Sequence, residues 1–148
     1  MRRNKIRSFS LVLMLGLASA SAHALENSGA IKVKQLIKTT QSWNGDPITY
    51  PVGQAEITGM MVEFAPGAET GWHKHPAPSF GVILEGELFV TLKDGKTKLL
   101  KAGDAAVEVT NTWHNGKNTG TVPTKLIVFY AGAVGQQLTV RDTQKDEK

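Results

Sequence analysis

The sequence predicts an all-β protein, either a sandwich or a barrel. Short runs of strand-forming residues follow one another between residues 56 and 140, and turn dipeptides such as Asp94-Gly95 separate them. No segment shows a long apolar pattern with helical period. Cysteine is absent, which excludes disulfides, thiolate zinc sites and cysteine nucleophiles. Stability must therefore come from a packed core.

Residues 1–24 have the pattern of a secretory signal peptide. The segment starts with basic residues, continues with an apolar run at 11–17, and ends in the small-residue site Ala22-His23-Ala24. The apolar run is too short to cross a bilayer, which takes ~20 residues. We therefore predict cleavage after Ala24 and a periplasmic or secreted protein. The alternative is a disordered or amphipathic N-terminal arm.

Removing residues 1–24 changes the charge balance. The segment carries four of the seventeen Lys and Arg residues and no acid, so thirteen basic residues remain against thirteen Asp and Glu. The mature chain is formally neutral, which leaves no electrostatic footprint for nucleic acid. No membrane partner is expected after signal cleavage, and the expected partner is a small-molecule ligand or substrate.

Residues 25–55 are expected to form an extended N-terminal arm. Residues 31–40 suggest a short strand, with a helix around Leu36-Ile37 as the alternative. Residues 43–53 are rich in turn-forming Asn-Gly and Asp-Pro pairs, with Trp43 and Tyr50 as anchors. Such an arm covers a sheet edge or a neighbouring subunit, so we predict a homodimer. A flexible linker is the alternative.

The barrel itself is expected over residues 56–140, with a solvated tail at 141–148. Its strands are predicted at 56–64, 72–75, 79–84, 87–92, 97–100, 105–109 and 125–131, with a last edge strand at Leu138 and Val140. Pro76 and Pro78 should bend the chain after the second strand. At least one residue of each adjacent pair should face inward among the core candidates Met60, Met61, Phe80, Phe89, Phe129 and Tyr130.

The sequence His73-Lys74-His75 indicates a metal site. Side chains two apart in a strand point to the same face, so both imidazoles can converge on one point, with Lys74 on the other face. A metal ion at about 2.0–2.1 Å from each ring nitrogen is the usual reason for such convergence. His114 is the remaining histidine once the signal peptide is removed.

Two blocks of spaced residues resemble the two motifs of the cupin superfamily, and specifically its small single-domain type with one conserved barrel. The positions that match are Gly67, His73, His75 and Gly86 in the first block, and Gly103, His114 and Asn118 in the second. The resemblance implies a double-stranded β-helix of the jelly-roll type, with a metal inside its mouth. It also implies that His73, His75 and His114 are the metal ligands.

Three positions depart from the family pattern. Val109 replaces the usual proline, and Asn111 replaces a glycine in a turn where asparagine tolerates the left-handed conformation. Ser79 stands in the place of the glutamate that completes the metal shell in many cupins. The resemblance thus implies three histidines without a protein carboxylate, holding Fe, Mn, Ni, Zn or Cu. The alternative is a degenerate cupin whose imidazoles bond to each other or to water.

Four residues near the motifs are candidate pocket residues: Ser79, Trp113, Tyr130 and Glu69. Packing competes with a place at the rim for Trp113, and a solvated loop acid competes with a place at the mouth for Glu69. The resemblance implies a metal-dependent enzyme with dioxygenase-like chemistry on a chelating anionic substrate. The alternatives are a non-catalytic periplasmic metal- or ligand-binding module and an oxygen-independent isomerase or lyase. No catalytic residue is assigned.

Overall fold

The computed structural model describes residues 31–143. The predicted signal peptide and residues 144–148 of the predicted tail lie outside the described residues. The chain divides into two units, Met1–Lys34 and Gln35–Lys148. In the first unit, residues 31–34 are described; they are exposed and belong to no strand. The second unit holds the barrel.

Nine strands form two sheets in the described residues. The first sheet has the order β1-β8-β3-β6 and the second the order β5-β4-β7-β2-β9. No helix occurs between residues 31 and 143, and so none there could span a membrane. The strands are β1 (Ala55–Phe64), β2 (His73–Lys74), β3 (Ser79–Glu85), β4 (Glu87–Leu92), β5 (Thr97–Lys101), β6 (Ala105–Val107), β7 (His114–Lys117), β8 (Thr124–Ala133) and β9 (Val140–Arg141).

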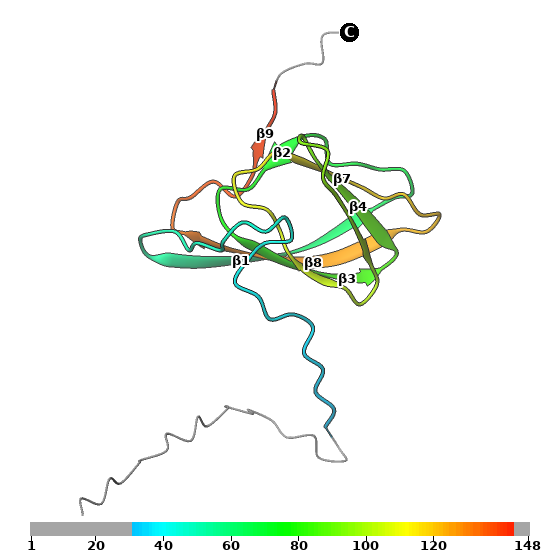
Figure 1. The fold of residues 1–148 in the computed structure, drawn as a ribbon, viewed down its shortest axis with the longest axis horizontal. Helices are drawn as coiled ribbons and strands as arrows, with labels where there is room; N and C mark the ends of the chain where they lie inside the picture. The colour runs from blue at the N-terminus through cyan, green and yellow to red at the C-terminus, as the bar shows by residue number, and fades with distance from the viewer. Residues whose placement is uncertain (1–30, 144–148) are drawn as a thin grey trace, which may run out of the picture. The chain divides into compact units, whose positions relative to one another are not determined.

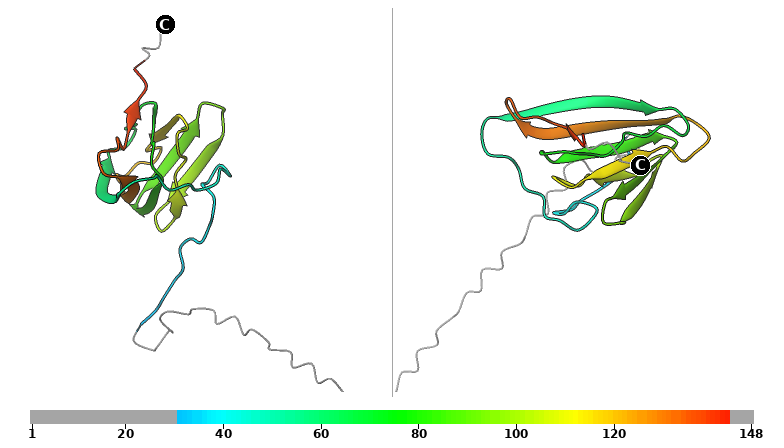
Figure 2. Two further views of the ribbon diagram at one scale, coloured as in Figure 1. Left: turned by 90° about the vertical axis from the view of Figure 1, so that its left-hand side faces the viewer. Right: turned by 90° about the horizontal axis from the view of Figure 1, so that it is seen from above.

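Every pair of named strands runs antiparallel. β8 lies between β1 and β3, and its pairing with β1 runs without a register shift from Ala55↔Ala133 to Phe64↔Thr124. Figure 1 shows β1, β8 and β3 on one side of the barrel and β2, β7 and β4 on the other. The second view of Figure 2 shows β1 and β8 side by side along their length. This is the double-stranded β-helix that the sequence predicts.

The core lies between the two sheets because alternate residues of each strand point inward. Phe64, Ile83, Leu88, Val90 and Leu100 form one buried cluster, with members from both sheets. On β8 the inward residues include Val128 and Tyr130, each 7% exposed, whereas Phe129 between them is 49% exposed.

Neither of the two adjacent methionines is buried, although Met60 shares the inward face of β1 with Val62 and Phe64, as the prediction of one inward-facing residue per pair requires. Met60 is 42% exposed and Met61 is 69% exposed. Both lie on β1, which is an edge strand of its sheet with only β8 beside it. Strand alternation separates two faces, but an edge strand is covered less completely on either of them.

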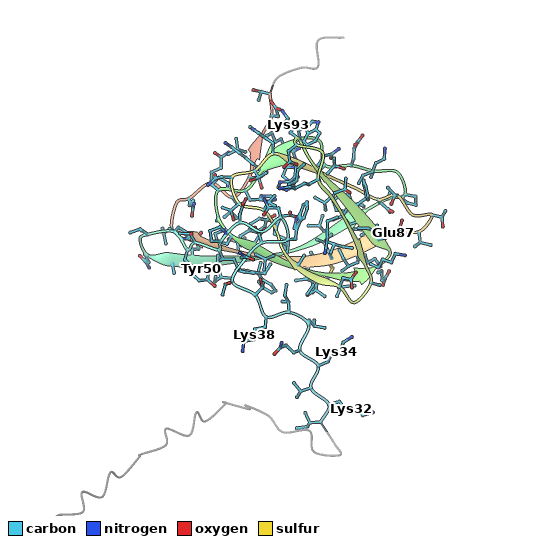
Figure 3. The ribbon with its side chains drawn as sticks, viewed as in Figure 1. Lys32, Lys34, Lys38, Tyr50, Glu87 and Lys93 are labelled. Carbon is cyan, nitrogen blue, oxygen red and sulfur yellow. The ribbon has the colours of Figure 1, made fainter. Side chains whose placement is uncertain are left out.

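The N-terminal arm folds back on its own barrel. Residues 40–48 make a tight turn in which Ile48 N donates to Thr40 O, and residues 31–39 form neither strand nor helix. Trp43 N donates to Val107 O at 3.1 Å, and its ring packs against the core cluster. Tyr50 is 65% exposed and so is not buried against the barrel as an anchor would be (Figure 3). The homodimer remains a prediction.

The predicted start of the solvated tail at residue 141 is corrected by β9. Arg141 is a strand residue that pairs with His73. Asp142 N donates to Trp72 O, and the Asp142 carboxylate forms an ion pair with Lys93. The sequence predicted the last strand at Leu138 and Val140, whereas the backbone pairing runs through Arg141 and Asp142.

Three motif positions shape the turns around the site. Gly86 has φ of 71°, and a Cβ there would lie 2.6 Å from Pro123 O. Asn111 has φ of 54°, the left-handed conformation expected where it replaces a glycine. Asn118 is fully buried, and its amide donates to Phe64 O and Val122 O. The loop after β7 is therefore tied to the end of β1.

Candidate metal centre

Three strand-borne histidines come together between the two sheets. His73 on β2 and His114 on β7 are register partners on neighbouring strands, and His75 follows β2, with a parallel bridge to Thr110. All three are buried, with exposures of 8%, 6% and 2% for His73, His75 and His114. The centroids of their rings lie 4.3 to 5.0 Å apart.

Backbone carbonyls fix the tautomer of each histidine. The Nδ1 atoms lie 2.9 Å from Gly71 O for His73, 2.9 Å from Leu138 O for His75, and 2.8 Å from Thr112 O for His114. A carbonyl oxygen only accepts hydrogen bonds, so each Nδ1 must carry the proton. Each Nε2 is left with a free lone pair. Such outer hydrogen bonds orient the histidine ligands of metals.

The three rings offer a set of nitrogens suited to one ion. One ligand atom from each histidine lies within 4.8 Å of the other two. Within residues 31–143, these histidines are the group of three or more His, Cys, Asp or Glu side chains close enough to hold a metal ion. Burial lowers the pKa of His73, and it lowers the pKa of His75 to about 4. The histidine cluster therefore holds neutral imidazoles at these two positions at neutral pH, as metal ligation requires.

A cavity of about 210 Å³ opens beside the histidine cluster. Residues of both sheets line it, including Ser79 and Tyr130, which the sequence placed near the site. The Tyr130 ring centroid lies 5.1 Å from that of His75. Burial raises the pKa of Tyr130 above its ordinary value, so its hydroxyl keeps its proton at neutral pH.

The Ser79 side chain lines this cavity with a hydroxyl that makes no hydrogen bond. Its Oγ is the buried side-chain polar atom that lacks a hydrogen-bond partner in the described part of the chain. Buried hydroxyls are normally bonded, so this one has room for a partner that is not part of the protein. Three imidazoles and this hydroxyl, all lining one cavity, fit a borderline divalent ion such as Zn, Cu, Fe or Ni.

Glu108 is a cavity-lining residue that the sequence analysis did not assign to the site. It lines the cavity from the residue after β6, and its Oε1 accepts hydrogen bonds from Trp43 Nε1 at 2.8 Å and Val109 N at 3.0 Å. Both bonds use one carboxylate oxygen. A lone acid in the apolar run Ala-Ala-Val-Glu-Val is the sequence signal that could have identified it.

Three polar residues at the mouth were also missed: Thr70, Thr139 and Arg141, which line the same cavity. Arg141 is exposed, and its guanidinium donates to Thr70 O at 3.2 Å. Thr139 Oγ1 lies 3.2 Å from His75 Nδ1. Because Leu138 O already accepts from this Nδ1, the threonine oxygen is a second acceptor for the same N–H.

The other two candidate pocket residues lie away from the cavity. Trp113 immediately precedes β7 and does not line the cavity, and the ammonium groups of Lys74 and Lys93 lie 5.0 and 5.3 Å from its ring centroid. Lys93 is labelled in Figure 3. Glu69 is exposed and accepts a hydrogen bond from Asn115 Nδ2. The structure therefore supports the packing role for Trp113 and the solvated loop acid for Glu69.

Comparison with known proteins identifies the domain. Residues 60–130 match the family model described as Cupin domain. A conserved protein with a double-stranded β-helix domain from Klebsiella pneumoniae has the same fold, with a TM-score of 0.52 at 20% identity over 81% of this chain and 98% of that one. The chain is a small cupin-domain protein.

The curated relatives are fungal and bacterial proteins. The chain is 38% identical to oryzines biosynthesis cluster protein J of Aspergillus oryzae over 51% of this chain and 42% of the relative. It is 29% identical to the cupin-domain-containing oxidoreductase virC of Hypocrea virens over 45% of this chain and 36% of the relative. The chain spans only 30% to 45% of the length of the curated relatives that it matches.

The lowered pKa of His75 predicts an acid-dependent loss of stability in the metal-free protein. Between about pH 6.5 and about pH 4, the unfolded chain binds a proton at this histidine that the folded chain does not. The stability contributed by the neutral buried ring is complete above about pH 6.5 and falls as the pH decreases toward 4, by about 3 kcal/mol in all.

Urea unfolding of the metal-free wild type and of His75→Gln at about pH 7 and about pH 4.5 measures this contribution. Glutamine stays neutral throughout, so the variant should lose less stability on acidification than the wild type. Groups that do not interact with His75 act equally in both proteins and cancel, so the difference reports His75 together with its charge coupling to His73 and His114. Identical pH dependence in the two proteins would contradict the assignment.

Proposed function

We propose that this protein is a metal-dependent oxidoreductase that acts on a small chelating anion, with His73, His75 and His114 as the metal ligands. The observation that carries the proposal is the set of three Nδ1–carbonyl hydrogen bonds, which leave three Nε2 lone pairs in one buried cluster. The naming of relatives such as virC as oxidoreductases supports the same class of activity. When bound, the metal supplies Lewis acidity and, if it is redox-active, electron transfer.

The residues around the histidine cluster favour an anionic substrate. No carboxylate belongs to the ligand group found in the described residues, so a divalent ion would keep its full charge against three neutral imidazoles. Arg141 adds a permanent positive charge at the mouth of the same cavity. The Glu108 carboxylate in the same cavity offsets Arg141, so the charge of the ion is what an anionic bidentate group, such as an enolate or a hydroxy-acid, balances.

Glu108 and Tyr130 are the groups in the cavity that can hold a proton beside the substrate. Trp43 and the Val109 amide fix the carboxylate of Glu108 through one oxygen. The Tyr130 hydroxyl is protonated at neutral pH and can donate to an anion. The apolar walls exclude water from these groups, which strengthens their electrostatic effect on a bound anion.

The metal site predicts that His114→Ala abolishes metal binding and, with it, activity. Wild-type protein reconstituted with Fe²⁺, Mn²⁺, Ni²⁺, Zn²⁺ or Cu²⁺ should retain close to one ion per chain by elemental analysis, and His114→Ala should retain little. At a metal concentration of about 100 times Kd, the ion should stabilise the wild type by about 3 kcal/mol and the variant by nearly nothing. Lys98→Ala, an exposed change on β5, is the matched control.

Oxygen uptake by the Fe²⁺-loaded protein with 1,3-diketones, hydroxy-acids and catechols then tests the reaction. We expect uptake and product in the wild type and in Lys98→Ala, and neither in His114→Ala. Metal and chelator binding without any turnover would instead establish the non-catalytic binding module. A wild type that retains no metal after reconstitution would refute both.

Ser79→Glu is predicted to tighten metal binding and lower activity. The serine side chain lies buried in the cavity with its Oγ unpartnered, so a carboxylate at this position can complete the ligand set. Affinity should rise on the order of tenfold, while the added ligand occupies a position that a bidentate substrate needs. Ser79→Ala is the control for loss of the hydroxyl. Unchanged metal affinity in Ser79→Glu would show that residue 79 does not face the ion.

We also propose that the protein is exported, on the basis of the signal pattern in residues 1–24. Expressed in a Gram-negative host, the full chain should be found in the periplasmic fraction with Leu25 as its first residue, as read by N-terminal sequencing. Ala24→Asp should block cleavage, because the site requires a small uncharged residue. An intact Met1 terminus in cytoplasmic wild-type protein would rule export out.

A further inference from the structure

The cavity beside the histidine cluster extends into the hydrophobic core. All five members of the buried core cluster, Phe64, Ile83, Leu88, Val90 and Leu100, also line the cavity. These residues belong to the most buried part of the protein, with exposures from 1% to 8%. The core of this barrel is therefore hollow on the side that faces the candidate metal centre.

A cavity in the core lowers the free energy of unfolding. Protein interiors pack about as densely as organic crystals, with few voids larger than a water molecule, and unfilled core volume lowers stability. The whole cavity, from its polar mouth to the core, has a volume of about 210 Å³. For comparison, an engineered apolar cavity of about 150 Å³ stays dry and binds benzene. An apolar group of a ligand is the natural occupant of such a space.

The strand register shows that the cavity changes from polar to apolar along the strands. At the position of the histidine cluster, which we call the first level, Leu92 is paired with His114 in one sheet and Ser79 with Tyr130 in the other. The 5.1 Å contact between the rings of His75 and Tyr130 shows that this level is shared by both sheets.

Four residues away on β3 and on β4, the lining is apolar. Ile83 pairs with Leu126 in the first sheet, and Leu88 occupies the equivalent place on β4. Ile83 and Leu88 belong to the same core cluster, so this second level is also shared by both sheets. Four strand residues span about 13 Å, which separates the polar and the apolar ends.

Two glycines lie midway between these levels and line the cavity. Gly81 pairs with Val128 on one sheet, and Gly116 pairs with Val90 on the other. Neither is among the glycines with positive φ, so the backbone does not require glycine at these positions. A Cβ at Gly81 would lie 3.6 Å from its nearest neighbour and one at Gly116 would lie 3.5 Å away, both ordinary contact distances.

The absence of a side chain at these two positions thus has no local structural cause. Glycine in a strand interior weakens the strand and often marks a place where a ligand approaches closely. We infer that Gly81 and Gly116 form a throat through which the apolar tail of the substrate passes from the metal centre into the hollow core. The substrate class is a chelating anionic head with an apolar tail of roughly four to six carbons. The inference rests on the proposed function, because the metal centre holds the head.

Alkyl hydroxamates of increasing chain length, from acetohydroxamate to octanohydroxamate, test the inference on the full-length protein loaded with Zn²⁺. Each carries the same chelating head, and isothermal titration calorimetry reports the affinity without any turnover. We expect affinity to rise about fourfold per added methylene, and to stop rising near hexanohydroxamate when the apolar end is full.

Gly81→Val should abolish the dependence on chain length while leaving the affinity for acetohydroxamate within about twofold of the wild type. Val82→Ile is the matched control, because it adds one methylene at the adjacent position, which does not line the cavity. Gly116→Ala is the second variant, should the larger valine impair folding. Each variant is checked for cooperative thermal unfolding and for retained Zn²⁺.

The outcomes separate the two proposals. If acetohydroxamate binds but longer chains bind no better, the inference is overturned and the proposed metal centre stands. An equal dependence on chain length in the wild type and in both glycine variants overturns the throat. If the wild type binds Zn²⁺ but no hydroxamate, or binds no Zn²⁺, the proposed function fails and the inference fails with it.

Discussion

The three hydrogen bonds from imidazole Nδ1 atoms to backbone carbonyls are the constraint on which the candidate metal centre depends. Without them each ring could rotate or exchange tautomers, and the three Nε2 lone pairs would not be directed to one place. The acceptors come from separate segments: Gly71 before β2, Thr112 before β7, and Leu138 before β9. Leu138 lies beyond residues 60–130, so the segment that orients His75 is outside the part matched by the family model.

Much of the fold and the histidine set could be predicted because they depend on local rules. Strand formers between turn signals marked most strands, and an H-x-H pair in extended chain must share one face. The resemblance to the two family motifs grouped His114 with His73, and the structure makes them register partners. Asn111 was expected in a left-handed turn because it stands where the family has a glycine, and its φ is 54°.

The remainder of the site depends on which face a residue presents and on what the other sheet places opposite it. Glu108 and Arg141 line the cavity, yet alternation alone does not tell which half of a short strand faces inward. Leu138 and Val140 drew attention as the apolar residues near the C-terminus, whereas Thr139 and Arg141 between and after them reach the mouth. Trp113 and Glu69 were candidates by proximity in sequence, and both belong to loops whose side chains lie outside the cavity.

The hollow core also determines how the barrel responds to compression. Hydrostatic pressure favours the state of smaller total volume, and unfolding eliminates internal voids. The cavity reaches into the buried cluster, so the dry part of its volume is lost on unfolding and lowers the pressure at which the empty protein unfolds. A molecule that fills the space removes that void from the folded state. Resistance to pressure thus becomes a property of the complex rather than of the chain alone.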